Sequence, residues 1–521
     1  MNVLSIYLSH NASATLIQDG EITEVLEFER FFNVKNQGCL DSIPLENPLR
    51  GIKGILSYFK SKYHVYHYDV LLTNVWSTIS LRRFHLASDN AILSFFNAKK
   101  LELIDHQYAH MATAFYQTDL ESSRGISYDG SGNDGNFNIY DCSRTKGIKL
   151  IDKVEGYKLG WKYSYFGEKT KSIRKEPDFW QQGGLVYPGK LMGLASYGNV
   201  REDWLPHFND FNNAGFNPQF PEYQTLIKNC NIPDQYSGQT EYDVVATAQR
   251  SFEETFDRLA RPYFQNENKL LLSGGCALNI TNNQRIAKER KIYVPPNPGD
   301  GGLTLGFALD YLKPKQKYNA TFMGPEVWDK HNLMEYVQKY NGQEVSHMNL
   351  AKELLKGKII GIVRDRAELG PRALGNRSII CHAAQPGMKD ILNAKVKNRE
   401  YYRPFAPICR KDEMNKFFEM TSSPHEHMSL CPTVREEYRE TLASITHIDN
   451  TARLQVTDEY DSPTFYHILA NIAEMNPYPV LLNTSFNIAG KPILNTYRDA
   501  IWMLENTEMD GLILEDYYIK K

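Results

Sequence analysis

Long apolar runs are missing from this chain of 521 residues. No stretch reaches the roughly 18 consecutive apolar residues that a membrane-spanning helix needs. The first twenty residues, MNVLSIYLSHNASATLIQDG, also lack the basic start and apolar centre of a secretory signal. We therefore expect a cytoplasmic protein without a membrane partner.

Paired cysteines and one-sided charge are missing as well. The seven cysteines are scattered and none forms a CxxC pair, which argues against a disulfide framework and against a cysteine-rich zinc site. The 59 basic and 62 acidic side chains nearly cancel, so net charge points to no polyanionic or polycationic partner. The oligomeric state is left open.

The composition is that of an ordinary globular protein, with 42% hydrophobic and 23% charged residues. A chain of this length is expected to divide into two or more domains. Residues 313–330 lose periodicity and carry Pro, Gly and Lys, which indicates a boundary. We predict a first domain at 1–315, a linker at 316–347 and a second α/β domain at 348–521.

Two similar strand–loop–strand patterns begin about 120 residues apart. Residues 3–8, 13–18 and 21–28 read as strands, with Asp19-Gly20 as a hairpin turn. Residues 124–141 repeat the pattern as RGISYD, GSGNDG and NFNIYD. The repeat favours a duplicated, two-lobed α/β domain, which is the organisation of the actin, sugar-kinase and Hsp70 superfamily.

Two histidines and two aspartates form the first candidate site. His106 and His110, in IDHQYAHMATAFYQ, are four residues apart and share one face of a predicted helix. Asp129 follows a strand in SYDGSG, and Asp300 lies in the glycine-rich segment PNPGDGG. Imidazole and carboxylate ligands together suit a divalent metal; the alternative is chance helical spacing together with ordinary Asp-Gly turns.

Cations interleaved with Gly and Pro form the second candidate site. They occur in RDRAELGPRALGNRS (364–378), KVKNREYYRPFAP (395–407), THIDNTARLQV (446–456) and LLNTSFNIAGKPI (481–493). Guanidinium groups match phosphate oxygens, so we interpret the cluster as an anion pocket. The alternatives are structural salt bridges and a basic nucleic-acid groove.

Together these motifs, with GKLMGLASYG and LLSGGCALN, resemble the NodU/CmcH family of O-carbamoyltransferases, and the chain looks like a TobZ-like member. The resemblance covers about 1–310 and 350–521. It implies a duplicated actin/Hsp70-like (TsaD-like) N-terminal domain and a YrdC-like α/β C-terminal domain. In the family, carbamoyl phosphate and ATP give carbamoyl adenylate, whose carbamoyl group passes to an acceptor hydroxyl.

The resemblance assigns roles in the first domain. It implies that His106, His110, Asp129 and Asp300 bind the metal. Iron(II) is the metal expected, with Mn²⁺ or Zn²⁺ as alternatives. His10 is expected to act as a base or ligand and Lys35 to face the nucleotide, while Asn11 stands where the family has Asp. Further nucleotide contacts are implied at Gly130, Gly274, Gly275 and Asn279.

It also assigns roles in the second domain. Catalytic roles are implied for Arg372, Lys397, Arg403 and His447. Binding of carbamoyl phosphate and of ATP with its Mg²⁺ is implied for Arg377, Arg399, Arg453, Ser485 and Asn487.

The acceptor is not specified by the sequence. The variable stretches 36–100 and 145–240 are expected to line its pocket, and candidates are natural products, sugars and nucleosides. GWKYSYFGEKTKSIRKEPDFW (160–180) mixes bases with aromatics, which leaves open a nucleic-acid acceptor such as a hydroxymethylated base, beside an ordinary charged insertion. Two rival functions are a sugar-kinase-like ATP-dependent kinase and an inactive nucleotide-sensing scaffold.

Overall fold

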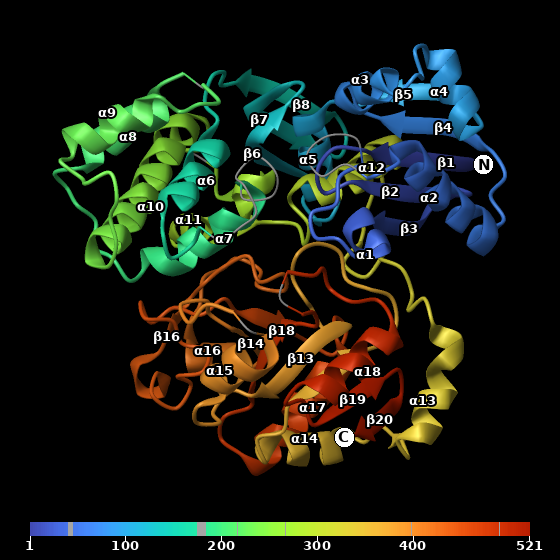
Figure 1. The fold of residues 1–521 in the computed structure, drawn as a ribbon, viewed down its shortest axis with the longest axis vertical. Coiled ribbons are helices and arrows are strands. Elements are labelled where there is room, and N and C mark those ends of the chain that lie inside the picture. The colour runs from blue at the N-terminus through green and yellow to red at the C-terminus, as the bar shows by residue number, and fades with distance from the viewer. Residues whose placement is uncertain (40–44, 175–183, 216, 266, 398, 489) are drawn as a thin grey trace. The chain divides into compact units, whose positions relative to one another are not determined.

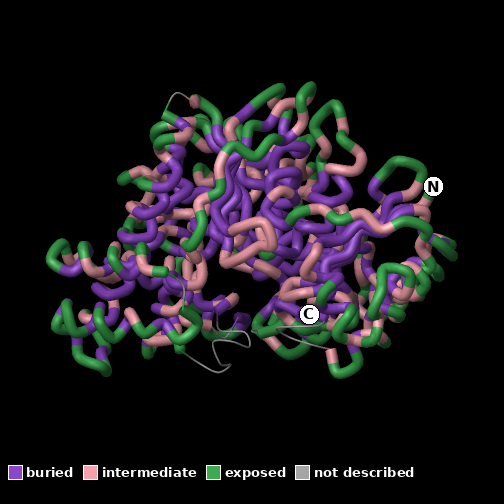
Figure 2. Tube along the Cα trace, turned by 90° about the horizontal axis from the view of Figure 1, so that it is seen from above, coloured by how far each residue is buried: buried purple, intermediate pink, exposed green. Residues whose placement is uncertain are grey.

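The computed structural model describes residues 1–39, 45–174, 184–215, 217–265, 267–397, 399–488 and 490–521. The chain forms two compact units (Figure 1). Unit 1 comprises Met1–Glu29 and Asn36–Asn319, and unit 2 comprises Arg30–Lys35 and Ala320–Lys521. Buried residues follow the strands through the interior, and exposed residues lie mainly on outer loops and helix faces (Figure 2). Within the described ranges, no helix has both the length and the apolarity to cross a membrane.

Unit 1 begins with the predicted hairpin. Strands β1 (Asn2–Tyr7), β2 (Ser13–Gln18) and β3 (Glu21–Glu27) run antiparallel. Asp19 and Gly20 form the turn with φ of 51° and 87°, the left-handed conformations that this dipeptide favours. Two parallel strands, β4 (Tyr68–Thr73) and β5 (Ala98–Leu103), complete a sheet in the order β3-β2-β1-β4-β5.

The second sheet of unit 1 repeats the first. Strands β6 (Ser122–Gly132), β7 (Gly135–Ser143) and β8 (Gly147–Lys153) form an antiparallel meander. Strands β9 (Lys269–Ser273) and β10 (Lys291–Tyr293) extend it in parallel, giving the order β10-β9-β6-β7-β8. Read from its antiparallel edge, each sheet therefore has the same strand order and directions.

Two helices cross between the sheets. Helix α5 (His106–Phe115) follows β5 but packs on β6 and β9 of the other sheet, while α12 (Leu303–Leu312) follows β10 but packs on β1 and β2. The helices also pack against each other, and Gly306 lets them approach closely, because a Cβ there would lie 2.1 Å from the carbonyl oxygen of Ala109. This exchange brings the start of each helix to the middle of unit 1.

The remaining helices of unit 1 surround these layers. They are α2 (Pro48–Tyr63), α3 (Val75–Arg83), α4 (Asp89–Phe96), α6 (Leu159–Lys169), α7 (Gly184–Ala195), α8 (Leu205–Asn213), α9 (Glu222–Asn229), α10 (Gln239–Ala260) and α11 (Ile280–Ala287). The helix predicted over 241–265 corresponds to α10.

Unit 2 is built on one mixed sheet in the order β11-β20-β19-β12-β13-β18-β14-β17. Its strands are β11 (Gln343–Glu344), β12 (Ile360–Val363), β13 (Arg377–His382), β14 (Ala406–Arg410), β17 (Gln455–Thr457), β18 (Val480–Ser485), β19 (Gly511–Leu514) and β20 (Tyr517–Lys520). A short pair, β15 (Phe418–Glu419) and β16 (Thr433–Val434), lies apart from this sheet. The mixed α/β class predicted for the protein is confirmed.

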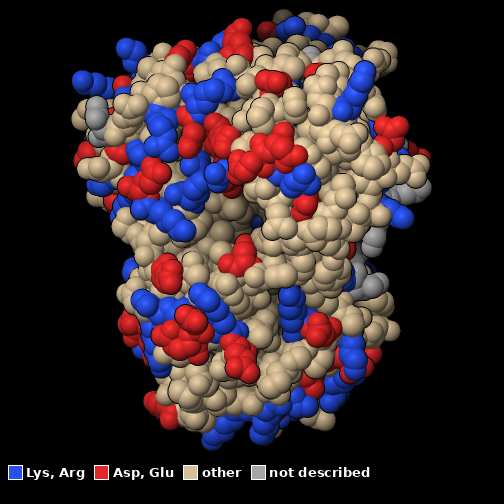
Figure 3. Space-filling view, turned by 90° about the vertical axis from the view of Figure 1, so that its left-hand side faces the viewer, with Lys and Arg blue, Asp and Glu red and all other residues tan. Residues whose placement is uncertain are grey.

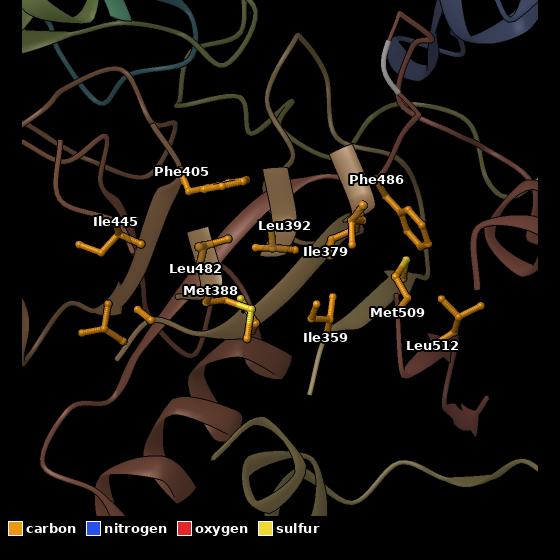
Figure 4. Packing of buried hydrophobic residues seen from close by; sticks show 14 of the residues in the cluster. Ile359, Ile379, Met388, Leu392, Phe405, Ile445, Leu482, Phe486, Met509 and Leu512 are labelled. Atoms are coloured by element: carbon orange, nitrogen blue, oxygen red, sulfur yellow. The ribbon is translucent and has the colours of Figure 1, made fainter. Parts of the chain in front are cut away.

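Each face of this sheet has its own apolar cluster. On one face Ile360, Ile362 and Ile380 join side chains of α14 (His347–Leu355) and α17 (Pro463–Met475). On the other face the cluster includes Ile359, Ile379, Leu482 and Phe486 (Figure 4). Helices α15 (Met388–Ile391) and α18 (Tyr497–Asn506) contribute to it. Side chains along β12 point alternately to one cluster and to the other, as expected of a strand that is buried on both faces.

Two stretches of unit 2 lie outside the predicted second domain. Helix α1 (Phe28–Phe32) leads into residues 30–35, where Arg30 donates to the Gly370 carbonyl at 3.1 Å and Phe31 packs edge-on against Trp328. Residues 320–347, which fall largely in the predicted linker, hold α13 (Leu333–Lys339) and also group with unit 2. A short helix, α16 (Met414–Phe417), precedes β15.

The close approach of α5 and α12 gives a stability prediction. Gly306→Ala should lower the stability of unit 1 by about 1–3 kcal/mol, because the added methyl group must push the two helices apart. Gly54→Ala in α2 is the matched control, since its Cβ would meet no atom within 4 Å and the change favours a helix. Calorimetric melting of both variants checks this; equal melting temperatures would contradict it.

Candidate functional sites

The four predicted metal ligands converge in unit 1. Their ligand atoms all lie within 4.8 Å of one another. The Nε2 atoms of His106 and His110 are 3.1 Å apart, and His110 Nε2 lies 2.9 Å from Asp129 Oδ2. Asp300 Oδ1 lies 3.4 Å from His106 Nε2 and 3.5 Å from His110 Nε2. The helical spacing therefore does place both imidazoles toward the carboxylates.

Backbone architecture explains why these four meet. The histidines are one turn apart at the start of α5, Asp129 lies near the end of β6, and Asp300 directly precedes α12. Two glycines leave room for Asp129. A Cβ on Gly274, which has φ of 89°, would lie 2.2 Å from the Tyr128 carbonyl oxygen, and one on Gly275 would lie 2.9 Å from Asp129 Oδ1.

Burial and charge make this group a cation site. Burial opposes protonation of His106, but the carboxylates of Asp300 and Asp129 outweigh it and raise its pKa to about 10. Burial likewise opposes ionisation of Asp300, yet the neighbouring His10 and His106 hold its pKa well below the usual value. In the absence of a metal the group therefore retains protons. Two imidazoles and two carboxylates fit Fe²⁺, Mn²⁺ or Zn²⁺.

Two aromatic side chains that the sequence did not single out flank the group. Tyr7 donates a 2.6 Å hydrogen bond to Asp300 Oδ2. The ring of Trp76 lies 5.7 Å from that of His106. Tyr7 ends β1 and Trp76 follows β4, so both lie at the carboxyl ends of adjacent parallel strands, where α/β sheets bind ligands. Strand order, had it been known, would have revealed them.

His10 is also at this group. Its Nε2 lies 3.4 Å from Asp300 Oδ2, and its Nδ1 is 3.1 Å from Asn11 Oδ1. Asn11 has a positive φ of 53°, which Asn and Asp tolerate better than other side chains. An amide oxygen at position 11 can accept from Nδ1–H and so leave Nε2 as the unprotonated nitrogen of a neutral ring.

The other predicted nucleotide contacts in unit 1 have protein partners in the structure. A Cβ on Gly130 would meet the Trp161 indole at 2.8 Å. Asn279 caps α11 by accepting from Asn282 N and exchanges hydrogen bonds with Gln249. These contacts explain the residue types locally, and nucleotide binding at Gly130, Gly274, Gly275 and Asn279 stays a prediction.

The predicted cations gather in unit 2. Lys397 ends a π-helical turn (Leu392–Lys397), and its Nζ donates to Ser485 O at 2.6 Å and to Asn487 Oδ1 at 2.6 Å. Arg399 lies over the Phe405 ring at 4.0 Å, and Arg403 pairs with Glu400 at 3.8 Å.

Mutual repulsion suits this cluster to a polyanion. Burial, then Arg403, lowers the pKa of Arg372 to about 10. Burial, then Arg372, Arg399 and Arg403, lowers the pKa of Arg453 well below its ordinary value. The pKa of Lys397 falls well below its usual range through burial and then through Arg399, Arg403 and Lys35. Lys35 thus acts on this cluster from the short segment 30–35.

Two predicted residues have other surroundings. All five N–H bonds of Arg377 are used within the protein, by Asn495 Oδ1 and by carbonyls of residues 364, 365 and 376. The geometry therefore favours a structural role for Arg377. His447 is buried between the Tyr402 carbonyl, 3.2 Å from Nε2, and Asp449 Oδ1, 3.3 Å from Nδ1.

Glu368, within the arginine-rich segment 364–378, shapes the arginine loop. Its Oε1 accepts from the backbone N–H groups of Leu374 at 2.6 Å, Gly375 at 3.2 Å and Arg377 at 3.3 Å. The loop closed by these bonds carries Arg372. A carboxylate that binds only main-chain groups has no sequence pattern of its own.

The segment 160–180 is largely internal where the structure describes it. Lys162 is fully buried and donates to the carbonyls of Phe211 and Ala214. Phe166 stacks on Phe208 with centroids 5.2 Å apart, and Tyr165 stacks on Phe220 at 4.2 Å. Lys175 and Trp180 lie outside the described residues. Lys162 and these aromatic side chains belong to the core of the helical layer, whereas Lys171 and Arg174 are exposed, and a nucleic-acid acceptor stays a prediction.

One face of the molecule carries charges of both signs. On the face drawn in Figure 3, Lys and Arg are interspersed with Asp and Glu. A phosphate backbone needs a run of basic side chains that tracks it.

The fold and the two clusters together define a two-unit α/β enzyme with one site suited to a cation and one suited to a polyanion. Family models of the carbamoyltransferase N-terminus and C-terminus match residues 62–309 and 351–521. The chain belongs to this carbamoyltransferase family and is an enzyme that transfers carbamoyl groups.

Relatives of known name agree with the assignment. The chain is 30% identical to a 3'-hydroxymethylcephem-O-carbamoyltransferase of Streptomyces clavuligerus, over 75% of this chain and 74% of that protein. It is 28% identical to the nodulation protein NolNO of Sinorhizobium fredii, over 98% and 79%. Among solved structures, HypF of T. kodakarensis is 14% identical with a TM-score of 0.34, over 61% of this chain and 49% of that chain; likeness at this level says nothing about activity.

The titration of the metal group gives a pH prediction. Since the raised pKa of His106 leaves it protonated near neutral pH, a divalent metal must displace at least one proton to bind. Affinity should then tighten about tenfold per pH unit for each proton released, up to a pH near that pKa. Co²⁺ titrations at three pH values, followed by visible absorption, measure this. A pH-independent dissociation constant would contradict the expected proton displacement.

Proposed function

We propose that the protein is an ATP-dependent O-carbamoyltransferase that makes carbamoyl adenylate in unit 2 and transfers its carbamoyl group to an acceptor hydroxyl in unit 1. The observation that carries the proposal is the pairing of two opposite sites on one chain, a polyanion site and a cation site. We assign unit 1 to the TsaD-like and unit 2 to the YrdC-like type. The repeated strand order of the two sheets supports the first assignment.

The cation cluster suits adenylation. Carbamoyl phosphate and ATP are both polyanions. Burial and neighbouring cations lower the pKa of Arg372, Lys397, Arg399 and Arg453, and a bound anion would relieve that repulsion. Water releases inorganic phosphate from carbamoyl phosphate and leaves carbamate. A carbamate oxygen then attacks the α-phosphorus of ATP, and pyrophosphate leaves. Mg²⁺ is expected with the ATP.

Within this cluster, Lys397 and its neighbours hold the anions. The hydrogen bonds from Lys397 to Ser485 and Asn487 fix its ammonium group at the end of β18. Ser485 Oγ donates to Asn487 Oδ1 at 2.6 Å, so the three side chains form one hydrogen-bonded group that carries the positive charge of Lys397. We assign Arg372, Arg399, Arg403 and Arg453 to the phosphates.

The metal group suits transfer. When bound there, a divalent cation polarises the carbamoyl carbonyl. His106, His110, Asp129 and Asp300 would hold it, with iron(II) the expected metal. His10 takes the proton of the acceptor hydroxyl on Nε2 while the oxygen forms its bond to the carbamoyl carbon, and AMP leaves. The hydrogen bond with Asn11 keeps the ring of His10 in the orientation and tautomer that this needs.

The two halves of the reaction should separate by mutation. Lys397→Ala or Arg403→Ala should reduce pyrophosphate release by about tenfold or more, since a charge-assisted hydrogen bond contributes about 1.5–3 kcal/mol. His106→Ala or Asp300→Ala should instead abolish transfer and metal binding while pyrophosphate release persists. Assays of pyrophosphate, AMP and bound metal on the four variants check this.

Three outcomes would overturn the scheme. Unchanged pyrophosphate release in Lys397→Ala would remove adenylation from unit 2. Full transfer by a His106→Ala, His110→Ala double variant would remove the metal role. Formation of ADP without carbamoyl phosphate would instead identify the rival kinase.

We propose a small molecule with a ring face as the acceptor, either a sugar or a nucleoside. Trp76 lies against His106, and Trp161 against the backbone beside Asp129. They come from the two variable stretches, 36–100 and 145–240, that were expected to line the acceptor pocket. Indole rings bind the apolar faces of such molecules. The internal packing of 160–174 argues against a DNA acceptor.

Labelled carbamoyl phosphate tests this acceptor assignment when it is offered with sugars, nucleosides and hydroxymethylated DNA. We expect label on a free small molecule and none on duplex DNA. Trp76→Ala should lower kcat/KM for that acceptor about fivefold, because an aromatic contact contributes about 1 kcal/mol. Pyrophosphate release should be unchanged. Trp76→Phe should retain most activity. Salt-sensitive labelling of DNA would contradict the proposal.

A further inference from the structure

The helix that carries both histidines is capped by a loop from another strand pair. The first three backbone N–H groups of α5 donate to the β6–β7 turn: His106 N to Asn133 Oδ1 at 3.2 Å, Gln107 N to Asp134 Oδ1 at 2.8 Å, and Tyr108 N to Asp134 Oδ2 at 3.2 Å. The residue preceding the helix, Asp105, makes no side-chain cap of its own.

Further bonds lock the turn and the helix together. Asn133 Nδ2 donates to Asp105 Oδ1 at 2.7 Å. Gln107, between the two histidines, donates to the Gly135 carbonyl at 3.3 Å and accepts from Ser127 Oγ at 2.5 Å. Every one of these partners lies in β6, β7 or their connection, which also carries Asp129.

The same hairpin therefore holds one metal ligand directly and two through the helix. Asp129 precedes Asp134 by five residues, and the strand pairing shifts register between Tyr128 and Gly132. Without the cap, the start of α5 would stay coupled to the hairpin only through Gln107 and the packing of the helix on β6 and β7, so a displacement of the turn would move Asp129 and the first turn of α5 by different amounts. The distances of 2.9 Å and 3.7 Å from Asp129 Oδ2 to the two Nε2 atoms depend on that coupling.

Charge adds to the effect of geometry. The N-terminus of an α-helix carries a partial positive charge, which would repel a divalent cation held by the first residue of that helix. The Asp134 carboxylate lies on this end and offsets that charge.

We propose that Asp134 is a positioning residue for the metal group: by capping α5 from the β6–β7 turn, it fixes His106 and His110 relative to Asp129. The inference rests on the metal role in the proposed function, and it assigns to Asp134 no contact with substrate.

The test measures binding of Co²⁺ to the full-length protein, with Asp134→Ala and Asp134→Asn beside the wild type. Asp134→Ala should raise the Co²⁺ dissociation constant about tenfold or more, the usual effect of removing an outer partner of a metal ligand. Its visible absorption spectrum should change, because the ligand geometry relaxes. Asp134→Asn keeps one oxygen acceptor and should fall between the two.

Asn47→Ala is the matched control, since Asn47 Oδ1 caps α2 through Arg50 N at 3.1 Å and that helix holds no ligand. It should lower the melting temperature and leave Co²⁺ binding unchanged. Wild-type affinity and spectrum in Asp134→Ala would overturn the inference even if the variant melts earlier. If Asp134→Ala does not fold, Asp134→Asn and Asn133→Ala decide the question by the same readouts. A wild type that binds no Co²⁺ would instead overturn the metal role itself.

Discussion

The crossing of α5 and α12 is the constraint on which unit 1 depends. Each helix leaves one sheet and packs on the other, so their N-termini meet where neither sheet alone could place them. Gly306 permits the approach, and Thr304 on α12 is tied to β1 and β2 by hydrogen bonds from Ser5 at 2.8 Å and Thr15 at 2.9 Å. The candidate ligands lie on α5, on β6 and on the turn that leads into α12, so the packing of the two helices also sets the geometry of the site.

Burying two carboxylates with two imidazoles is costly unless charge balances charge. Protons supply that balance in the metal-free protein, which is why His106 has a raised pKa and Asp300 a lowered one. A divalent cation bound to all four ligands would supply it too. The cluster in unit 2 has an excess of positive charge instead. Neighbouring cations there lower the pKa of Arg372 and Lys397, and bound phosphates would relieve the repulsion. The charge that each site lacks is therefore the charge that it is suited to bind.

Sequence patterns were sufficient to predict features that depend on residues close together in the chain. The Asp19-Gly20 turn, the i, i+4 histidines and the segment 241–265 led to a hairpin, a shared helix face and a long helix, all present in the structure. Sequence patterns failed where the interacting residues are distant in the chain. Arg377 lies in the same arginine-rich segment as Arg372, but all five of its N–H groups form hydrogen bonds within the protein. Only the fold distinguishes the two arginines. Tyr7 and Trp76 are brought to the site by strand order, and Asp134 by a turn that caps residues 26 or 27 positions earlier in the chain. No spacing rule expresses either relation.

The stretch at 160–180 mixes bases and aromatics, a composition that also occurs in nucleic-acid binding sites, but part of it packs inside the protein. Lysine can extend its ammonium group to carbonyls at the end of a helix, and Lys162 does so at the C-terminus of α8, where the partial negative charge of the helix favours a cation. Its aromatic neighbours stack on α8 and on the segment that leads to α9, and they build the layer on which α10 packs. The edge of this layer nearest Gly130 presents Trp161. What the stretch offers to a ligand is therefore set by which of its side chains pack inside the layer and which lie at its edge, and not by its composition.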